Sequence, residues 1–223
     1  MFSVFDPLTA LGILTLAAAD PNVCTMPQPT QINVVPRTAE VKLDTSMSKD
    51  EIQNHHVDTT NPYGYNVETH TLGYMRGRVQ MSQRVKINHQ MVMGNRGVCI
   101  WYESIDLDIS IDPTIVLASE LNKDECQFKA VYEHEMKHVM VDRKIVNKYA
   151  KSMGQKIYDG LGSRGFIVGP VKADNAQAVV DRMQKTVADI LKLESQKLEI
   201  ERMEKQQEID SLEEYQRVSN LCK

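Results

Sequence analysis

Residues 128–149, FKAVYEHEMKHVMVDRKIVNKY, decide the fold class of this chain and carry its clearest chemical signal. Apolar and ionisable side chains in this stretch recur at spacings of three and four residues, which is typical of a helix with one buried face. The pattern extends from about Lys123 to Asp159, and Gly160 or Gly162 ends it. We therefore predict a long helix whose inner face is formed by Phe128, Val131, Tyr132, Glu135, His138, Val139, Asp142, Ile145, Val146 and Tyr149.

The predicted helix contains the motif H-E-x-x-H, with His134, Glu135 and His138 at its defined positions. Residues four apart lie one turn along the same helix face, so the two imidazoles can hold one metal ion from one side. The carboxylate beside them can take a proton from a metal-bound water, whose pKa the ion lowers. We expect a zinc-dependent hydrolase in which His134 and His138 bind Zn²⁺ and Glu135 is the general base. The alternative is a surface histidine pair on an amphipathic helix.

A zinc site of this kind needs a third ligand, for which the sequence offers several candidates. Asp210 or Glu213 would have to come from the C-terminal part of the chain, and we favour Asp210. Asp142 follows His138 by one helical turn and is expected to orient that histidine from outside the ligand set. The histidines of the irregular N-terminal part are expected at the surface: His55, His56 and His70.

Two strands are predicted between residues 64 and 112. Apolar side chains of residues 79–93 alternate with charged ones, which indicates a half-buried strand or a hairpin, and His89, on the apolar phase, is expected to be a core histidine. A second strand covers residues 98–112, with Ile105, Leu107, Ile109 and Ile111 on one phase. Its phase shifts near Glu103 and Ser104, which indicates a bulge or turn.

The remaining segments are less regular. Residues 20–62 are predicted to form an irregular segment with short strands near residues 32–35 and 41–43 and a turn or small helix near residues 48–54. A short strand-like piece at 165–170 precedes a second helical region from about Asp174 to Leu221, which no Gly or Pro interrupts.

The motif helix resembles that of the zincin metallopeptidases. Residues 65–220 also resemble a bacterial family of predicted secreted zinc-dependent proteases, catalogued as a domain of unknown function, through Cys99 on a strand, Cys126 before the motif helix, and a long C-terminal helical stretch. Two features depart from these families. Lys137 stands at a usually uncharged motif position, and of the family's terminal motif, Tyr-Asp-x-x-Thr-x-His-Gly, only Asp210 is retained.

The resemblance implies an α+β fold: a zincin-like domain with a small antiparallel sheet, an active-site helix and a long C-terminal helical segment. It also implies hydrolysis of peptide bonds in a peptide or protein substrate. The expected organisation is a signal peptide at 1–19, an irregular lead-in at 20–63, a zincin-like core at 64–171, and a helical segment at 172–223 that packs on this core.

The N-terminus and the cysteines bear on the compartment. The apolar run from Leu8 to Ala19 looks like a signal peptide that ends near Asp20, although no positive charge precedes it. The alternative is a buried N-terminal helix. We expect a periplasmic or secreted protein, or a cytoplasmic one if the segment is not cleaved. The sequence has 4 cysteines, and two disulfides are expected, with Cys99–Cys126 and Cys24–Cys222 the favoured pairing of three; the alternative is unpaired thiols.

Composition limits the partners. A formal charge of -4 shows no excess of basic residues, so nucleic acid is not expected as a partner. The N-terminal apolar run is too short to span a bilayer, and no stable membrane span is expected in the mature chain. Two alternatives to a peptidase remain: a catalytically degenerate zincin that binds metal or peptides, and a non-enzymatic envelope protein that uses its C-terminal helix to bind a partner.

Overall fold

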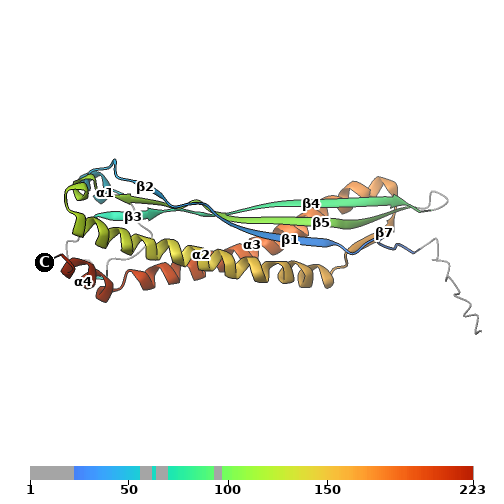
Figure 1. Ribbon diagram of the computed structural model, residues 1–223. Helices are drawn as coiled ribbons and strands as arrows, with labels where there is room; N and C mark the ends of the chain where they lie inside the picture. The colour runs from blue at the N-terminus through green and yellow to red at the C-terminus, as the bar shows by residue number, and fades with distance from the viewer. Residues whose placement is uncertain (1–22, 56–61, 64–69, 93–96, 223) are drawn as a thin grey trace, which may run out of the picture.

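The structure is a computed structural model and describes residues 23–55, 62–63, 70–92 and 97–222. The expected signal peptide and His56 lie outside these ranges. Figure 1 shows an elongated molecule in which long strands run along most of its length, with the helices α2 (Glu125–Gly162) and α3 (Ala176–Ile209) beside them. The α+β class expected from the sequence is confirmed.

Two sheets follow one another along the molecule, and each has a central strand between two outer strands. The larger sheet has the order β1-β5-β4, with β7 also paired to β5, and the smaller has the order β2-β6-β3. Pro113 separates β5 from β6 because proline has no amide hydrogen for the ladder. The strands are β1 (Gln31–Thr38), β2 (Lys42–Asp44), β3 (Gly73–Arg76), β4 (Val79–Met91), β5 (Val98–Ile111), β6 (Thr114–Leu117) and β7 (Ile167–Val171).

The expectation of a small antiparallel sheet is wrong in two respects. Both sheets are mixed, because β1 runs parallel to β5 and β2 runs parallel to β6. The central pair is also long, since β4 has 13 residues and β5 has 14. The segment expected as an irregular lead-in supplies both parallel strands. The short apolar alternation in this segment predicts strands. It does not predict their partners, because the partner of each parallel strand lies far away in the sequence.

The long hairpin of β4 and β5 agrees with the sequence pattern in its core part. Ile105, Leu107, Ile109 and Ile111 are buried, and the register shifts opposite Lys86 and Ile87, so that Glu103 has no partner on β4. The bulge predicted at this point is confirmed. His89 is exposed and not in the core, because the side-chain alternation of β4 continues past the part of the strand that packs on the core.

The helix that carries the motif has the predicted extent. Asp124 caps its first turn by accepting a hydrogen bond from the amide of Gln127, and the helix ends at Gly162. Before it come the short helix α1 (Lys49–Gln53), which confirms the small helix expected there, and a 3-10 turn at Ser119–Lys123.

The C-terminal helical region is two helices, although no Gly or Pro interrupts it. Helix α3 ends at Ile209, and α4 (Leu212–Asn220) begins after Ser211. Ser211 caps α4 by accepting a hydrogen bond from the amide of Glu214. A serine followed three residues later by a glutamate is a helix-start pattern, so the break has a local signal that the search for Gly and Pro overlooks.

Two apolar clusters hold these elements together. The larger lies between the long sheet, the C-terminal half of α2, and α3. The smaller joins α1, the smaller sheet and the N-terminal part of α2, and includes Ile115, Leu117, Val131 and Val139. Burial of Val131 and Val139 turns the motif face of α2 toward the protein interior. Among the described residues, no helix is long and apolar enough to cross a membrane.

Candidate metal centre

Three side chains from two parts of the chain converge at the start of α2. The Nε2 atoms of His134 and His138 lie 3.1 Å and 3.2 Å from the same carboxylate oxygen, Oδ1 of Asp210. One possible ligand atom from each residue falls within 4.8 Å of the others, and all three residues are buried. This His-His-Asp group could hold a metal ion.

The break between α3 and α4 positions Asp210. Its backbone, with φ -82° and ψ 45°, leaves the helix directly after Ile209, and its side chain is 4% exposed. A continuous helix through this point would present the carboxylate in another direction. The exposed Glu213, the other C-terminal candidate, belongs to α4 and lies outside the group.

The opposite nitrogen of each imidazole faces an acceptor. His134 Nδ1 lies 3.3 Å from Oε1 of Glu214, and His138 Nδ1 is hydrogen-bonded to Oε1 of Gln206. The amide nitrogen of Gln206 donates to the backbone oxygen of His138, so its oxygen is the atom left to accept. In their neutral form both rings can therefore donate from Nδ1, which leaves the Nε2 atoms that face Asp210 to bind an ion. Two imidazole nitrogens and a carboxylate oxygen that converge in this way form a donor set suited to a metal cation.

Glu214 is held as an anion behind His134. A hydrogen bond from Arg217 and another from Lys137 outweigh burial and lower the pKa of Glu214 to about 2. The Lys137 ammonium lies 2.6 Å from the Glu214 carboxylate, so the residue that departs from the usual motif has a place in the site. A permanently charged Glu214 fixes the tautomer of His134 by accepting its Nδ1 proton.

A buried polar chain stands behind His138. Arg202 binds the Asp142 carboxylate through two nitrogens, at 2.7 Å and 3.1 Å, and Gln206 donates to the same carboxylate at 2.7 Å. Asp142, expected to orient His138, reaches that ring only through Gln206. Gln206 was not among the residues singled out from the sequence. Its place one helical turn before Asp210 on α3 is the signal that could have identified it.

Glu135 is buried beside this group. Burial raises its pKa above the usual range, against the opposing effect of the two neighbouring histidines. The backbone amide of Met75, on β3, donates a hydrogen bond to its carboxylate. The pKa of His138 is also raised, since the Asp210 and Glu135 carboxylates outweigh the effect of burial. A raised carboxylate pKa in a cavity is common among catalytic acids and bases.

Two cavities border the group, one along β3 and one between α2 and α4. Both are lined by Thr71, Gly73, His134, Glu135 and Tyr215. The Tyr215 ring lies edge-on to His134, with centroids 5.8 Å apart, and burial raises the pKa of its phenol. The two N-terminal histidines that the structure describes are exposed, as expected, but each lines one cavity: His55 the first and His70 the second.

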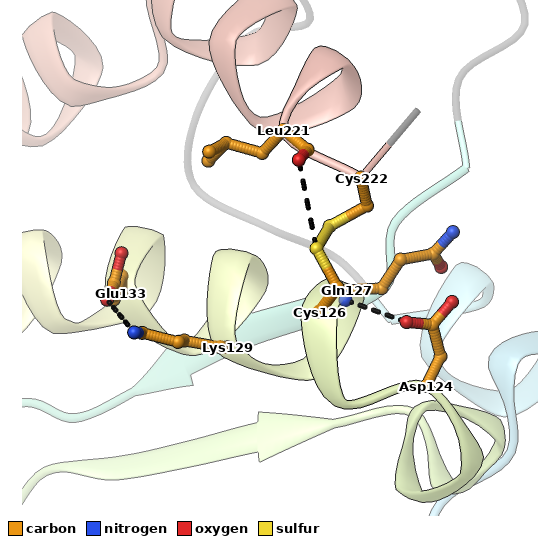
Figure 2. Close-up of a disulfide and its surroundings, with 7 residues drawn as sticks. All are labelled: Asp124, Cys126, Gln127, Lys129, Glu133, Leu221 and Cys222. Atoms are coloured by element: carbon orange, nitrogen blue, oxygen red, sulfur yellow. Dashed lines mark hydrogen bonds and ion pairs between the residues drawn. A yellow bond between two sulfur atoms is a disulfide. The ribbon is translucent and has the colours of Figure 1, made fainter.

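A disulfide attaches α4 beside the site. Cys126, in the first turn of α2, is bonded to Cys222, directly after α4, as Figure 2 shows. The second disulfide joins Cys24 to Cys99. Two disulfides were expected, but the favoured pairing is wrong. Cys99 lies near the start of β5 and Cys126 follows the end of β6 at Leu117, and the strands between them span roughly 60 Å at about 3.3 Å per residue, far beyond the reach of a disulfide.

No protein-family model, no curated protein and no solved structure matches this chain. Any function of the site therefore has to follow from the geometry and chemistry of its own residues.

Proposed function

We propose that this protein is a zinc-dependent hydrolase that cleaves peptide bonds. One observation carries the proposal: two imidazole lone pairs and a carboxylate oxygen converge on one point, and a buried glutamate with a raised pKa stands beside it. Three nitrogen and oxygen donors with a remaining open side are the usual protein contribution to a catalytic zinc site. The motif, the burial of its histidines and their hydrogen bonds to Glu214 and Gln206 support a zinc site over an incidental histidine pair.

The chain's own residues have distinct duties in this proposal. His134, His138 and Asp210 would hold the ion, which would supply a bound water of lowered pKa and a Lewis acid for the substrate carbonyl. Glu135 accepts a proton from the attacking water and delivers it to the leaving amine, for which its raised pKa suits it. The Met75 amide keeps the carboxylate aimed at the site.

Tyr215 supplies a hydrogen-bond donor on the substrate side. Its raised pKa keeps the phenol protonated at neutral pH, and it lines both cavities beside the ion position. A neutral O–H at this place can stabilise the negative oxygen of a tetrahedral intermediate.

The form of the cleft favours a peptide substrate. β3 pairs with β6 along one edge, and in the described part of the chain no strand pairs with its other edge. An extended peptide can add to such an edge, which would bring its backbone past Glu135. The two disulfides indicate an oxidising compartment, which supports a periplasmic or secreted enzyme.

Glu135→Gln tests the proposal, because it keeps the shape of the side chain and removes its basicity. Zinc content, measured by elemental analysis, should be unchanged, while cleavage of an unstructured protein substrate should fall by at least about a hundredfold. Glu133→Gln, an exposed site on the same helix, should retain full activity.

Undiminished cleavage by Glu135→Gln would contradict the catalytic assignment. Wild-type protein that binds zinc but cleaves no peptide would support the alternative of a metal- or peptide-binding protein without catalysis.

A further inference from the structure

The two cavities beside the metal centre differ in chemical character. The cavity between α2 and α4 has a volume of about 400 Å³, and the cavity along β3 toward α3 about 250 Å³. They share the side chains of Glu135 and Tyr215, so both open onto the same reaction point. A chain that crosses the site therefore has room on both sides of the scissile bond.

The cavity between α2 and α4 has several apolar side chains in its lining. Leu72, Ala130, Val131 and Val218 line it, and uncharged Gln127 and Ser219 are among its other lining residues. Apart from Glu135, His134 and His70, none of the described residues that line it is ionisable at neutral pH. A cavity of this size and lining suits a large aliphatic or aromatic side chain.

The cavity along β3 carries arginine side chains in its lining. Arg76 lines it, with its side chain 57% exposed and 3.9 Å from the Asp44 carboxylate, and His55 lies on the same side. Arg202 also lines it but is committed to Asp142. The only acidic residues among its described lining are Glu135 and Asp210. An acidic side chain would meet the Arg76 guanidinium there, in competition with the Asp44 carboxylate.

We propose that the preferred substrate is an extended peptide cleaved at an interior bond, with a large apolar side chain on one side of that bond and an acidic side chain on the other. The apolar side chain occupies the cavity between α2 and α4, and the acidic one faces Arg76. This inference rests on the proposed peptidase function and specifies its substrate class.

The two preferences should differ in strength. Filling an apolar cavity discriminates between large and small side chains by about 10- to 200-fold. The Arg76 guanidinium is largely in water, where an ion pair is weak, so the preference for an acidic over a basic side chain should be about three- to tenfold.

The experiment uses the zinc-loaded full chain and a mixture of synthetic decapeptides with all residues varied, and mass spectrometry locates each cleavage. Wild-type protein should cleave interior bonds flanked by a large apolar residue on one side and Asp or Glu on the other. Arg76→Glu should reverse the charge preference to Lys or Arg and leave the apolar preference intact. Arg78→Gln, an exposed arginine two residues away that does not line the cavity, should leave both preferences unchanged.

A second variant tests the apolar cavity. Ser219→Trp adds bulk to its lining and should shift the preference from large to small side chains by about tenfold or more. Gln216→Trp, exposed on α4 and outside the lining, is the matched control.

A readout independent of turnover is peptide binding to the inactive Glu135→Gln protein. The best cleaved peptide should bind about three- to tenfold tighter than its analogue with Lys in place of the acidic residue, and Arg76→Glu should reverse this order. Cleavage without either preference, or a charge preference that Arg76→Glu does not change, would overturn the substrate assignment and leave the peptidase function standing. Failure to cleave any peptide in the mixture would overturn both.

Discussion

At the scale of single residues, the site depends on which nitrogen of each imidazole carries its proton. Glu214 and Gln206 can accept from the two Nδ1 atoms, and in neutral rings this leaves both Nε2 atoms, which face Asp210, to bind an ion. The neighbours of Glu214, Lys137 and Arg217, keep it ionised, and Arg202 with Asp142 holds Gln206. Glu214, Gln206 and their neighbours therefore orient the two histidines for a cation without being ligands themselves.

The buried Glu135 should reduce the stability of the zinc-free protein at neutral pH. Its folded pKa is raised, so the folded state binds its proton more tightly than the unfolded state, and stability falls as pH rises from about 4.5 through the folded pKa. Glu135→Gln removes this penalty and should make chelator-treated protein more stable than the wild type at pH 8. Urea unfolding at pH 5 and pH 8 measures it.

The difference in the free energy of unfolding between Glu135→Gln and the wild type should increase from pH 5 to pH 8. The exposed Glu133→Gln should show no such difference. A Glu135→Gln protein less stable than wild type at pH 8 would mean that the carboxylate is not under strain in the folded chain.

At the scale of elements, the short helix α4 closes the site. It carries Glu214 and Tyr215, and the break before it positions Asp210. None of its residues is fully buried: Val218 packs against the smaller apolar cluster, and polar contacts and the disulfide between Cys126 and Cys222 also hold the helix in place. The sulfur of Cys126 is also 3.8 Å from the backbone oxygen of Leu221 (Figure 2).

Removing each disulfide should therefore have a different effect. The pair of substitutions Cys126→Ser and Cys222→Ser should loosen α4 and weaken zinc affinity by about tenfold or more, as losses of outer-shell support do. The matched pair, Cys24→Ser and Cys99→Ser, should lower overall stability by about 2–5 kcal/mol, because it removes a cross-link at the start of β5, away from the metal centre.

Zinc affinity of each double variant is measured by competition with a chromophoric chelator at a temperature at which both are folded. Equal zinc affinity in the two double variants would show that α4 does not depend on its disulfide.

At the scale of the whole molecule, the sequence predicts local features well and distant pairings poorly. The extent of α2, the bulge at Glu103 and the face that carries His134 and His138 follow from periodicity within one segment. The parallel strand β1, the disulfide pairing and the contact of Gln206 with His138 join residues far apart in the chain. Such contacts depend on how elements pack, which a single sequence does not specify.

The central claim is that His134, His138 and Asp210 form one zinc site, and zinc titration of chelator-treated protein against a competing chelator tests it most directly. Wild type should bind about one zinc per chain. Loss of a residue that only supports a metal ligand weakens zinc affinity by about 10- to 100-fold, and Asp210→Ala should weaken it more than that. Glu213→Ala, at an exposed position on α4, should bind zinc as tightly as the wild type. Wild-type protein that takes up no zinc, or Asp210→Ala with undiminished affinity, would contradict the account.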